Sequence, residues 1–231
     1  LRLFIEQVEP QAIINAAAHN AVDAIETDDK VYAEALLMNG KVPGTLAQIA
    51  ASMNIPIIHI STDYVFAGTE ENGYAEDAVP APISRYGETK LAGEEAVKNS
   101  GAAEWYVVRI SRLFGVRGNS VTSKLSFVDI MLNKVKKGEV PLRVVADQFS
   151  APTYAPDAAE RILFLLTSNA PSGIYHAANA GVCSWYEWAQ EIFKQANVNV
   201  EIIPIPASEF PRPARAPQFS QLLSTKLPEL R

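Results

Sequence analysis

Short apolar runs alternate with longer amphipathic segments along the first half of the chain. Runs rich in β-branched residues at 12–14, 57–60 and 106–110 predict buried strands. Apolar residues recur at helical spacing over 31–53 and 86–98, which predicts helices between these strands. This alternation is typical of parallel strands buried between helices. We therefore expect an α/β fold built on a doubly wound parallel sheet.

The second half of the chain is less regular. Ser184 stands three residues before Glu187, the spacing of a capping box, and predicts that a helix begins there. Prolines recur from Pro204 onward, so this segment is expected to run extended. The other elements predicted here are helices at 127–135 and 158–166 and strands at 142–145 and 174–176.

Composition narrows the class of protein. The 231 residues are 48% hydrophobic, enough for a buried core, and a formal net charge of −6 argues against a nucleic-acid partner. No apolar run approaches the ~18 residues of a membrane-spanning helix. The single cysteine, Cys183, excludes an internal disulfide and suits the reducing cytosol. We expect a cytoplasmic protein that binds neither nucleic acid nor membrane.

Tyr86 and Lys90 are the strongest candidates for chemistry. Four residues apart on a predicted helix, they lie on one face, one turn apart. A phenol, with an ordinary pKa of about 10, exchanges protons near neutrality more readily when a cation stabilises its phenolate form. The pair also occurs by chance on solvated helices. However, the strand at 57–60 ends at Thr62 and Asp63, and ligands bind at such strand ends in open α/β sheets.

Small residues follow the first predicted strand. Ala17 and Ala18, followed by His19, would let a flat cofactor lie close to the backbone. Simple packing of a helix on the sheet would explain the two alanines equally well. His59 and His176 lie within apolar strands and match no metal-ligand spacing, so no metal site is expected.

The chain resembles the dTDP-4-dehydrorhamnose reductases of the extended short-chain dehydrogenase/reductase superfamily over nearly its whole length. The most specific motifs are STDYVF at 61–66 and YGETKLAGE at 86–94. Five further segments match in the same order: INAAAHNAVDAIE, VVRISRLFG, DQFSAPTYAPDAAE, GIYHAANAGVCSWYEWA and FPRPARAPQFSQLLSTKL. The resemblance implies a Rossmann-like sheet with a smaller C-terminal substrate-binding lobe. We expect the Rossmann-like domain over 1–140 and mainly the lobe over 141–231, with some strands of the second part free to return to the sheet.

The resemblance also implies a reaction. NADPH or NADH would deliver a hydride to the C4 ketone of dTDP-4-dehydro-L-rhamnose, giving dTDP-L-rhamnose for polysaccharide biosynthesis. Tyr86 would donate the proton, and Lys90 would bind the cofactor ribose and lower the pKa of Tyr86. Thr62 would bond the reacting oxygen. Ala17, Ala18 and His19 would lie along the cofactor, which Tyr86 would also contact.

The same resemblance places other side chains at the sugar nucleotide. Thr62 and Asp63 would contact it, and Arg215, in the C-terminal segment that folds over the substrate in this family, would suit a diphosphate. Arg112 would stack on a ring or pair with a phosphate. It occupies a position where the family usually has a tryptophan, so the sugar itself stays open.

The chain departs from the family pattern in its first part. The Gly-x-x-Gly-x-x-Gly segment that cradles a pyrophosphate, expected roughly 50 residues before the alanine-rich segment, is not in this sequence. We therefore expect an incomplete nucleotide-binding domain, and a truncated, inactive fragment stays open. Ala216 also interrupts the family's Pro-Ala-Arg-Arg-Pro pattern.

Two alternatives remain. Another extended short-chain enzyme, a nucleotide-sugar epimerase or dehydratase, would share the Tyr86–Lys90 pair, but dehydratases often carry Asp-Glu after the threonine, where this chain has Asp63-Tyr64. A non-catalytic regulatory subunit could keep the fold, although the intact catalytic residues favour an enzyme. The choice between NADPH and NADH, a homodimer and metal dependence are left open.

Overall fold

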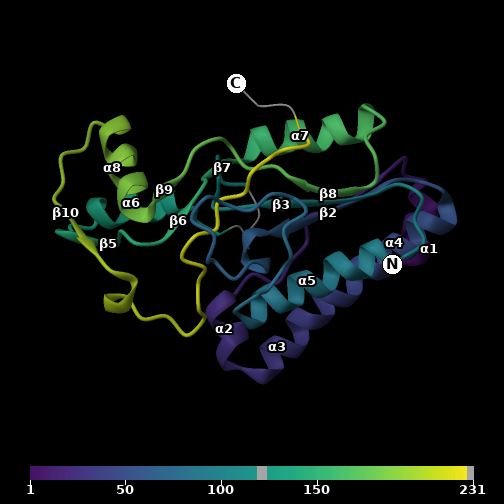
Figure 1. Cartoon of the computed structure of the whole chain (residues 1–231), viewed down its shortest axis with the longest axis horizontal. Helices are drawn as coiled ribbons and strands as arrows, with labels where there is room; N and C mark the ends of the chain where they lie inside the picture. Colours follow the sequence, from purple (N-terminus) through teal and green to yellow (C-terminus); the bar gives the residue numbers. More distant parts are fainter. Residues whose placement is uncertain (119–123, 228–231) are drawn as a thin grey trace.

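A four-stranded parallel sheet forms the centre of the structure, a computed structural model that describes residues 1–118 and 124–227. Every neighbouring pair of strands in the sheet is parallel, in the order β1-β2-β3-β8 (Figure 1). The strands are β1 (Ile13–Asn15), β2 (Ile57–Thr62), β3 (Trp105–Ile110) and β8 (Gly173–His176).

Helices cover both faces of this sheet, as Figure 1 shows. Ile57 and Val107 pack with α4 (Val42–Met53) and α5 (Arg85–Lys98) on one face. Their neighbours along the strands, Ile58, Tyr106 and Val108, pack instead against Leu165 of α7 (Ala155–Thr167) on the other face. Because successive strand residues point to opposite faces, the apolar runs are buried on both sides. The predicted doubly wound α/β fold is confirmed.

A smaller lobe stands beside the sheet. Its parallel strands β5 (Leu142–Val145) and β10 (Ile202–Ile205) pack with α6 (Phe127–Lys136) and α8 (Trp185–Gln195). The helix predicted at Ser184 is confirmed. The Ser184 Oγ accepts the Glu187 N–H at 3.1 Å, and the Glu187 carboxylate accepts the Ser184 N–H at 2.7 Å. These two bonds satisfy backbone donors that the helix itself leaves free.

Elements cross the predicted domain boundary at residue 140 in both directions. α6 precedes it but packs in the core of the lobe, through Met131 against Ala189 and Phe193. α7 and β8 follow it but belong to the main sheet. We propose a lobe made of α6, β5, α8 and β10, with the chain passing between sheet and lobe more than once. The division at 140 stays a prediction.

The segment 31–53, predicted as one helix, has a more complex structure. It comprises most of α3 (Asp29–Ala35), the π-helix η1 (Leu36–Lys41) and α4. The hydrophobic pattern does not predict this change, because the apolar Leu37 and Met38 of η1 are exposed while the polar Asn39 is buried. The wider turn of the π-helix brings Asn39 fully into the interior. Such π-segments often lie at functional sites.

The C-terminal segment, residues 206–227, passes over the carboxyl ends of the strands at Ser220 and Leu223, and its last residues, Lys226 and Leu227, lie near the start of β8. It forms isolated bridges, Phe149 with Phe219 and Tyr74 with Leu222. The segment from Pro204 is extended as predicted, apart from the 3-10 turn η3 (Ala207–Glu209). Pro204 itself lies in β10, a strand that was not predicted from the sequence.

Within the described residues, no helix is long and apolar enough to span a membrane. The remaining elements are α1 (Arg2–Val8), α2 (Val22–Thr27), the 3-10 turn η2 (Asp63–Val65), β4 (Leu113–Phe114) paired with β7 (Thr153–Tyr154), and β6 (Phe149–Ser150) paired with β9 (Cys183–Ser184).

Candidate active site

The end of β2 and the start of α5 meet at the carboxyl edge of the sheet. Thr62 is the last residue of β2, and its side chain lies beside the phenol of Tyr86 in the first turn of α5, close enough to lower the pKa of that phenol. The helix is held in place at its start by Ser84, whose Oγ accepts the Gly87 N–H at 3.2 Å. The structure thus brings together Thr62 and Tyr86, which the sequence analysis assigned to the same reaction.

Gly87 makes this meeting possible. A β-carbon at residue 87 would lie 2.3 Å from the carbonyl oxygen of Tyr64, a distance that no side chain tolerates. With glycine in this place, α5 approaches the backbone after Thr62, and the rings of Tyr64 and Tyr86 pack edge to face with centroids 5.6 Å apart. Tyr64 is therefore a second phenol at the site, one to which the sequence analysis gave no role.

The surroundings of Tyr86 favour its protonated form. Burial raises the pKa of the phenol, the charge of nearby Asp63 raises it further, and the Thr62 side chain opposes both effects. Tyr86 therefore keeps its proton at neutral pH. A protonated phenol beside a hydroxyl is suited to give a proton to an oxygen that becomes negatively charged.

Lys90 lies one turn further along α5 and is 2% exposed. Its Nζ donates a 2.6 Å hydrogen bond to the carbonyl oxygen of Ile60. Burial lowers the pKa of Lys90 to about 8, while the charge of Glu94 acts in the opposite direction. Among the described residues, the groups found to shift the pKa of Tyr86 are Asp63, Tyr64 and Thr62. The predicted lowering of the Tyr86 pKa by Lys90 stays a prediction.

Asp63 is buried and hydrogen-bonded on several sides. Its carboxylate accepts the hydroxyls of Ser220 at 2.6 Å, Thr62 at 3.1 Å and Ser150 at 3.4 Å. Burial raises the pKa of Asp63, while the bonds from Ser220 and Thr62 and the charge of Arg112 lower it. Asp63 thus ties the C-terminal segment to the end of β2. Its predicted contact with a sugar nucleotide stays a prediction.

The loop after β1 leaves its small side chains exposed. Ala17 and Ala18 lie on the surface, and the Ala17 N–H is fixed by the Oδ1 of Asn15 at 3.2 Å. His19 is half-buried, with an Nδ1 that is buried and has no hydrogen-bond partner. An exposed strip of alanines with a free polar atom beside it fits the flat face of a dinucleotide.

Asn39 joins this loop to the catalytic helix. Its Oδ1 accepts the His19 N–H at 2.7 Å, and its Nδ2 donates to the His19 carbonyl at 2.9 Å and to the Thr89 hydroxyl at 3.0 Å. Asn39 was not predicted from the sequence as a site residue. The available signal was an Asn-Gly pair, both poor helix formers, in the middle of a segment predicted to be helical.

Arg112 connects the sheet to the lobe. Its guanidinium donates to the carbonyl oxygens of Cys183 at 2.8 Å and Gln148 at 2.9 Å, and lies over the Trp185 ring at 3.9 Å. The backbone of Arg112 has a φ of 42°, an uncommon conformation for a residue with a side chain. Burial lowers its pKa to about 10, so it stays charged at neutral pH. The charge acts on Asp63 and Tyr64.

A cavity of about 270 Å³ lies between the end of β5 and the C-terminal segment, with Arg212 and Arg215 in its wall. Arg215 is exposed. Arg212 pairs with Asp23 at 2.9 Å, and its charge also lowers the pKa of the Tyr64 phenol. This electrostatic interaction links the cavity to the catalytic residues. Two guanidinium groups beside an open cavity suit a phosphate-bearing ligand.

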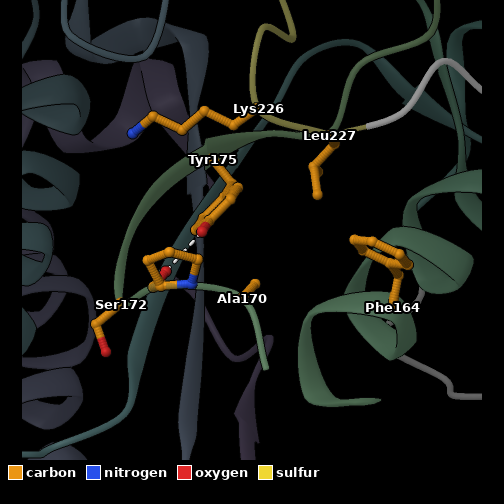
Figure 2. A pocket seen from close by; sticks show the side chains of 7 residues that line it. Phe164, Ala170, Ser172, Tyr175, Lys226 and Leu227 are labelled. Carbon is orange, nitrogen blue, oxygen red and sulfur yellow. Dashed lines mark hydrogen bonds between the residues drawn. The ribbon is translucent and has the colours of Figure 1, made fainter. Parts of the chain in front are cut away.

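A second cavity, of about 350 Å³, lies at the opposite edge of the sheet. Figure 2 shows its lining, in which the Tyr175 hydroxyl donates to the Pro171 carbonyl at 2.5 Å. Ala170, Pro171 and Ser172 precede β8, so this cavity lies at the amino end of that strand, and none of the predicted site residues lines it. Ligands of open parallel sheets bind at the carboxyl ends. The larger cavity is therefore not the candidate site.

The described residues contain no group of three or more metal-binding side chains that could hold an ion. His59 is buried, its Nδ1 lies 3.1 Å from the Asn15 amide, and burial lowers its pKa to about 3. His176 is likewise buried, with a pKa lowered to about 4. Both imidazoles are neutral at physiological pH and lie within the packed interior.

Comparison with known proteins places this site in a family. The family model described as the RmlD substrate binding domain matches residues 1–230. A dTDP-4-dehydrorhamnose reductase of Burkholderia thailandensis is 36% identical over 245 residues, which cover 99% of this chain and 78% of that protein. The chain belongs to the dTDP-4-dehydrorhamnose reductase family.

Other members of the family extend the comparison. A crystal structure of dTDP-4-dehydrorhamnose reductase from Bacillus anthracis, in complex with NADP, has a TM-score of 0.86 and 35% sequence identity, and covers 97% of this chain and 75% of that one. A dTDP-4-keto-6-deoxy-D-glucose reductase of Streptomyces niveus is 32% identical and covers 96% of this chain and 74% of that protein. The predicted family and its Rossmann-like fold are confirmed.

Proposed function

We propose that the protein reduces the C4 ketone of a dTDP-4-dehydro sugar with NADPH, and that dTDP-4-dehydro-L-rhamnose is its substrate. The observation that carries the proposal is the protonated Tyr86 beside the Thr62 side chain at the carboxyl end of β2, in a chain of this family. The relatives named above act on dTDP-4-keto sugars by name, and one was crystallised with NADP.

The described residues fit each task of this reaction. A bound NADPH supplies the hydride. Tyr86 and Thr62 bind the ketone oxygen, and the Tyr86 phenol gives its proton to that oxygen as negative charge develops there. Lys90 contributes a buried positive charge one helical turn away. Its ammonium would bind the cofactor ribose. Ala17, Ala18 and His19 form the surface on which the cofactor lies.

The sugar nucleotide occupies the space between the catalytic residues and the arginine-lined cavity. Arg215 binds its diphosphate, since the guanidinium of Arg215 is exposed and free to form a two-pronged contact. Thr62 and Asp63 lie at the sugar end. Arg112 acts through its positive charge near Tyr64 and not through a direct contact with the sugar nucleotide, because two of its nitrogens donate to backbone carbonyls.

The alternative substrate is dTDP-4-keto-6-deoxy-D-glucose. The Streptomyces niveus relative is named for dTDP-4-keto-6-deoxy-D-glucose, and Arg112 stands where the family usually has a tryptophan. The reaction, the cofactor and the roles of Tyr86 and Thr62 would be the same for either sugar. We place the reaction in the cytoplasm, which suits a chain with one cysteine. Sedimentation of the purified protein would test whether it is a homodimer.

The test uses protein expressed from its complete gene. Consumption of NADPH is followed by absorbance with each of the two sugars, and NADH is tried in parallel. We expect turnover, and a loss in kcat of roughly 10²–10⁴-fold for Tyr86→Phe, because only the proton donor is removed. The control is Tyr186→Phe, a phenol on α8 that contacts only Gln190 among the hydrogen bonds described. A protein that binds NADPH but reduces neither sugar would refute the proposal.

A further inference from the structure

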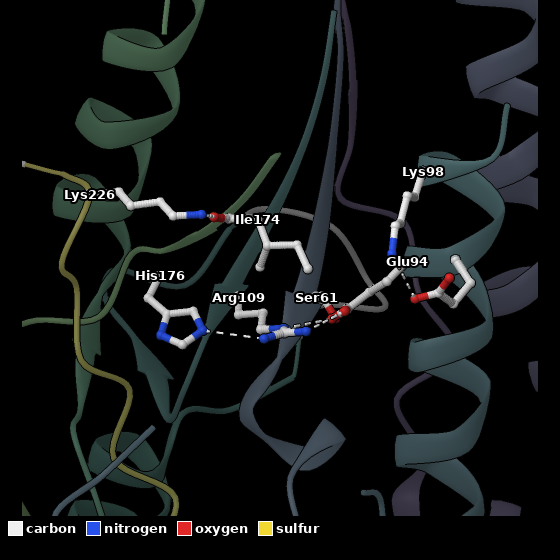
Figure 3. A network of polar contacts seen from close by, with 8 residues as sticks. Ser61, Glu94, Lys98, Arg109, Ile174, His176 and Lys226 are labelled. Atoms are coloured by element: carbon white, nitrogen blue, oxygen red, sulfur yellow. Dashed lines mark hydrogen bonds and ion pairs between the residues drawn. The ribbon is translucent and has the colours of Figure 1, made fainter. Parts of the chain in front are cut away.

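Glu94 lies on the same face of α5 as Tyr86 and Lys90, one turn beyond the lysine. Its Oε1 accepts the Ser61 hydroxyl at 2.5 Å and the Arg109 Nε–H at 3.0 Å, and its Oε2 accepts the Arg109 Nη2–H at 2.7 Å. Figure 3 shows Arg109 and Ser61 converging on this carboxylate. One side chain thus connects α5 with β2 and β3.

The position of Ser61 gives this connection a direct bearing on the site. Ser61 immediately precedes Thr62, so the bond to Glu94 fixes the strand end that presents Thr62 to Tyr86. The Glu94–Arg109 pair is buried, with 2% and 0% of the two side chains exposed. Buried ion pairs rarely stabilise a fold more than apolar residues of the same size would. Stability alone is therefore a poor reason for this pair.

On the side away from Glu94, the guanidinium of Arg109 faces the uncharged ring of His176. Its Nη1 lies 3.5 Å from the Nε2 of His176, whose Nδ1 lies 3.0 Å from the carbonyl oxygen of Leu223. Only a donor can bond a carbonyl, so the imidazole proton is on Nδ1, and His176 accepts from Arg109 as a neutral ring. The salt bridge of Arg109 among the described residues is with Glu94.

We propose that Glu94 is a positioning residue: it locks the helix that carries Tyr86 and Lys90 to the strand that carries Thr62, and its negative charge supports the Lys90 ammonium. The inference rests on the proposed reductase function. It goes beyond that function by assigning the protonation of the lysine to a side chain that does not touch the substrate.

Other charged groups lie near Lys90, but Glu94 is the one found to raise the pKa of Lys90. His59, on β2, interacts with Lys90 but is neutral at physiological pH, because burial lowers its pKa to about 3. The Glu94 charge is the effect that raises the pKa of Lys90 against burial. On β3, Arg109 pairs with Glu94 and is not among the groups found to shift the pKa of Lys90. On the helices packed against the start of α5, Glu26 and Asp29 bond instead to Arg85.

Two variants separate charge from geometry. Glu94→Gln keeps the length of the side chain and loses its charge, whereas Glu94→Asp keeps the charge and shortens the reach to Ser61 and Arg109. The measurement is kcat against pH at saturating NADPH and sugar. We expect Glu94→Gln to move the alkaline limit of activity to lower pH, by on the order of one pH unit. Glu94→Asp should lower kcat and leave that limit in place. Glu95→Gln, which removes an exposed carboxylate from the same helix, is the control and should match the wild type.

Glu94→Gln leaves Arg109 buried without its partner, so this variant is open to misfolding. The double variant Glu94→Gln/Arg109→Met removes both charges, and should keep the fold and move the pH limit in the same direction. A purely structural role for Glu94 predicts lower kcat in these variants with no movement of the limit. That result would overturn the proposal.

A direct titration makes the inference independent of turnover. The pKa of Lys90 is followed by NMR in protein labelled with ¹³C-lysine, with the signal assigned by its absence in Lys90→Met. We expect a lower Lys90 pKa in both variants that lack the Glu94 charge than in the wild type. If no sugar is reduced but the pKa falls, the proposed function fails and the role of Glu94 on Lys90 stands. An unchanged pKa refutes that role whatever the activity.

Discussion

The Nζ of Lys90 lies 2.6 Å from the carbonyl oxygen of Ile60, and the side chain is only 2% exposed. A cation in this position has lost its water, and the carbonyl and the charge of Glu94 replace only part of that solvation. Burial therefore lowers the pKa of Lys90 to about 8, from an ordinary value of 10.5. The protonated lysine must destabilise the folded state at neutral pH, so we infer that it is kept for its charge at the site.

This inference predicts the behaviour of Lys90→Met. Below pH 8 the wild-type lysine is charged in both the folded and the unfolded chain, and the folded chain bears the cost of burial. We expect the variant to be more stable at pH 7 by roughly 1–3 kcal/mol, and to lose activity. The advantage should shrink from pH 8 to 10.5, where the folded wild type releases its proton before the unfolded chain does.

Urea unfolding at a series of pH values measures this difference. Lys98→Met, at an exposed position near the end of α5, is the matched control and should show no such pH dependence. A Lys90→Met variant that is less stable than the wild type at pH 7 would mean that the Ile60 hydrogen bond outweighs the cost of burial.

The close approach of α5 to the backbone after Thr62 gives a second prediction. A methyl group at residue 87 would lie 2.3 Å from the Tyr64 carbonyl, so Gly87→Ala must push the helix away from the strand end. We expect a loss of about 1–3 kcal/mol in stability and at least a tenfold loss in kcat, since Tyr86 and Thr62 move apart. In Gly173→Ala the nearest atoms would be 3.9 Å away, and this control should keep its activity. Normal activity in Gly87→Ala would show that the Tyr86–Thr62 distance does not limit the reaction.

Local patterns in the sequence were enough to predict part of this site. Thr62 follows an apolar run, and Tyr86 and Lys90 are four residues apart, so a strand end and a helix face could be assigned without knowing the fold. The capping box at Ser184 is equally local, and the structure has it.

The remaining contacts depend on long-range packing. Glu94 and Arg109 are 15 residues apart, and Asp63 and Ser220 are 157 apart, so no periodicity links them. Which charged residues of a helix are buried with a partner is decided by the neighbouring strands. Asn39 could not be predicted for another reason: in η1 the apolar Leu37 and Met38 are exposed and the polar Asn39 is buried, the reverse of what hydrophobicity predicts.

Asp63 gives a prediction with the opposite dependence on pH. Burial raises its pKa above the ordinary value of 3.8, so the folded chain holds the proton more tightly than the unfolded chain. The resulting stability is complete below the unfolded pKa and is lost as pH rises through the folded one. Asp63→Asn, which mimics the protonated acid, should equal the wild type near pH 3 and be more stable at pH 7.

Thermal unfolding from pH 3 to 8 follows this difference. Asp77→Asn, at an exposed position for which no such burial exists, serves as the control and should run parallel to the wild type. If Asp63→Asn is destabilised at pH 7, the three hydroxyls that bond the carboxylate stabilise its charged form more than burial penalises it.

Asn39 holds the proposed cofactor surface against the catalytic helix, so replacing it should weaken the binding of NADPH. Asn39→Ala removes two hydrogen bonds to the backbone of His19 and one to Thr89, and leaves those groups without these partners. We expect the loop of Ala17 and Ala18 to loosen and the Kd for NADPH to rise about 10- to 100-fold, equivalent to roughly 1–3 kcal/mol. Fluorescence titration with NADPH measures the change.

Asn99→Ala, which loses one bond at the exposed end of α5, is the control and should bind NADPH like the wild type. Asn39→Asp keeps the acceptor for the His19 N–H but buries a carboxylate oxygen against the His19 carbonyl, so its Kd should rise at least as far as that of Asn39→Ala. An Asn39→Ala variant that unfolds more readily yet binds NADPH with unchanged affinity would confine Asn39 to the interior packing, and the cofactor would then lie elsewhere than on this loop.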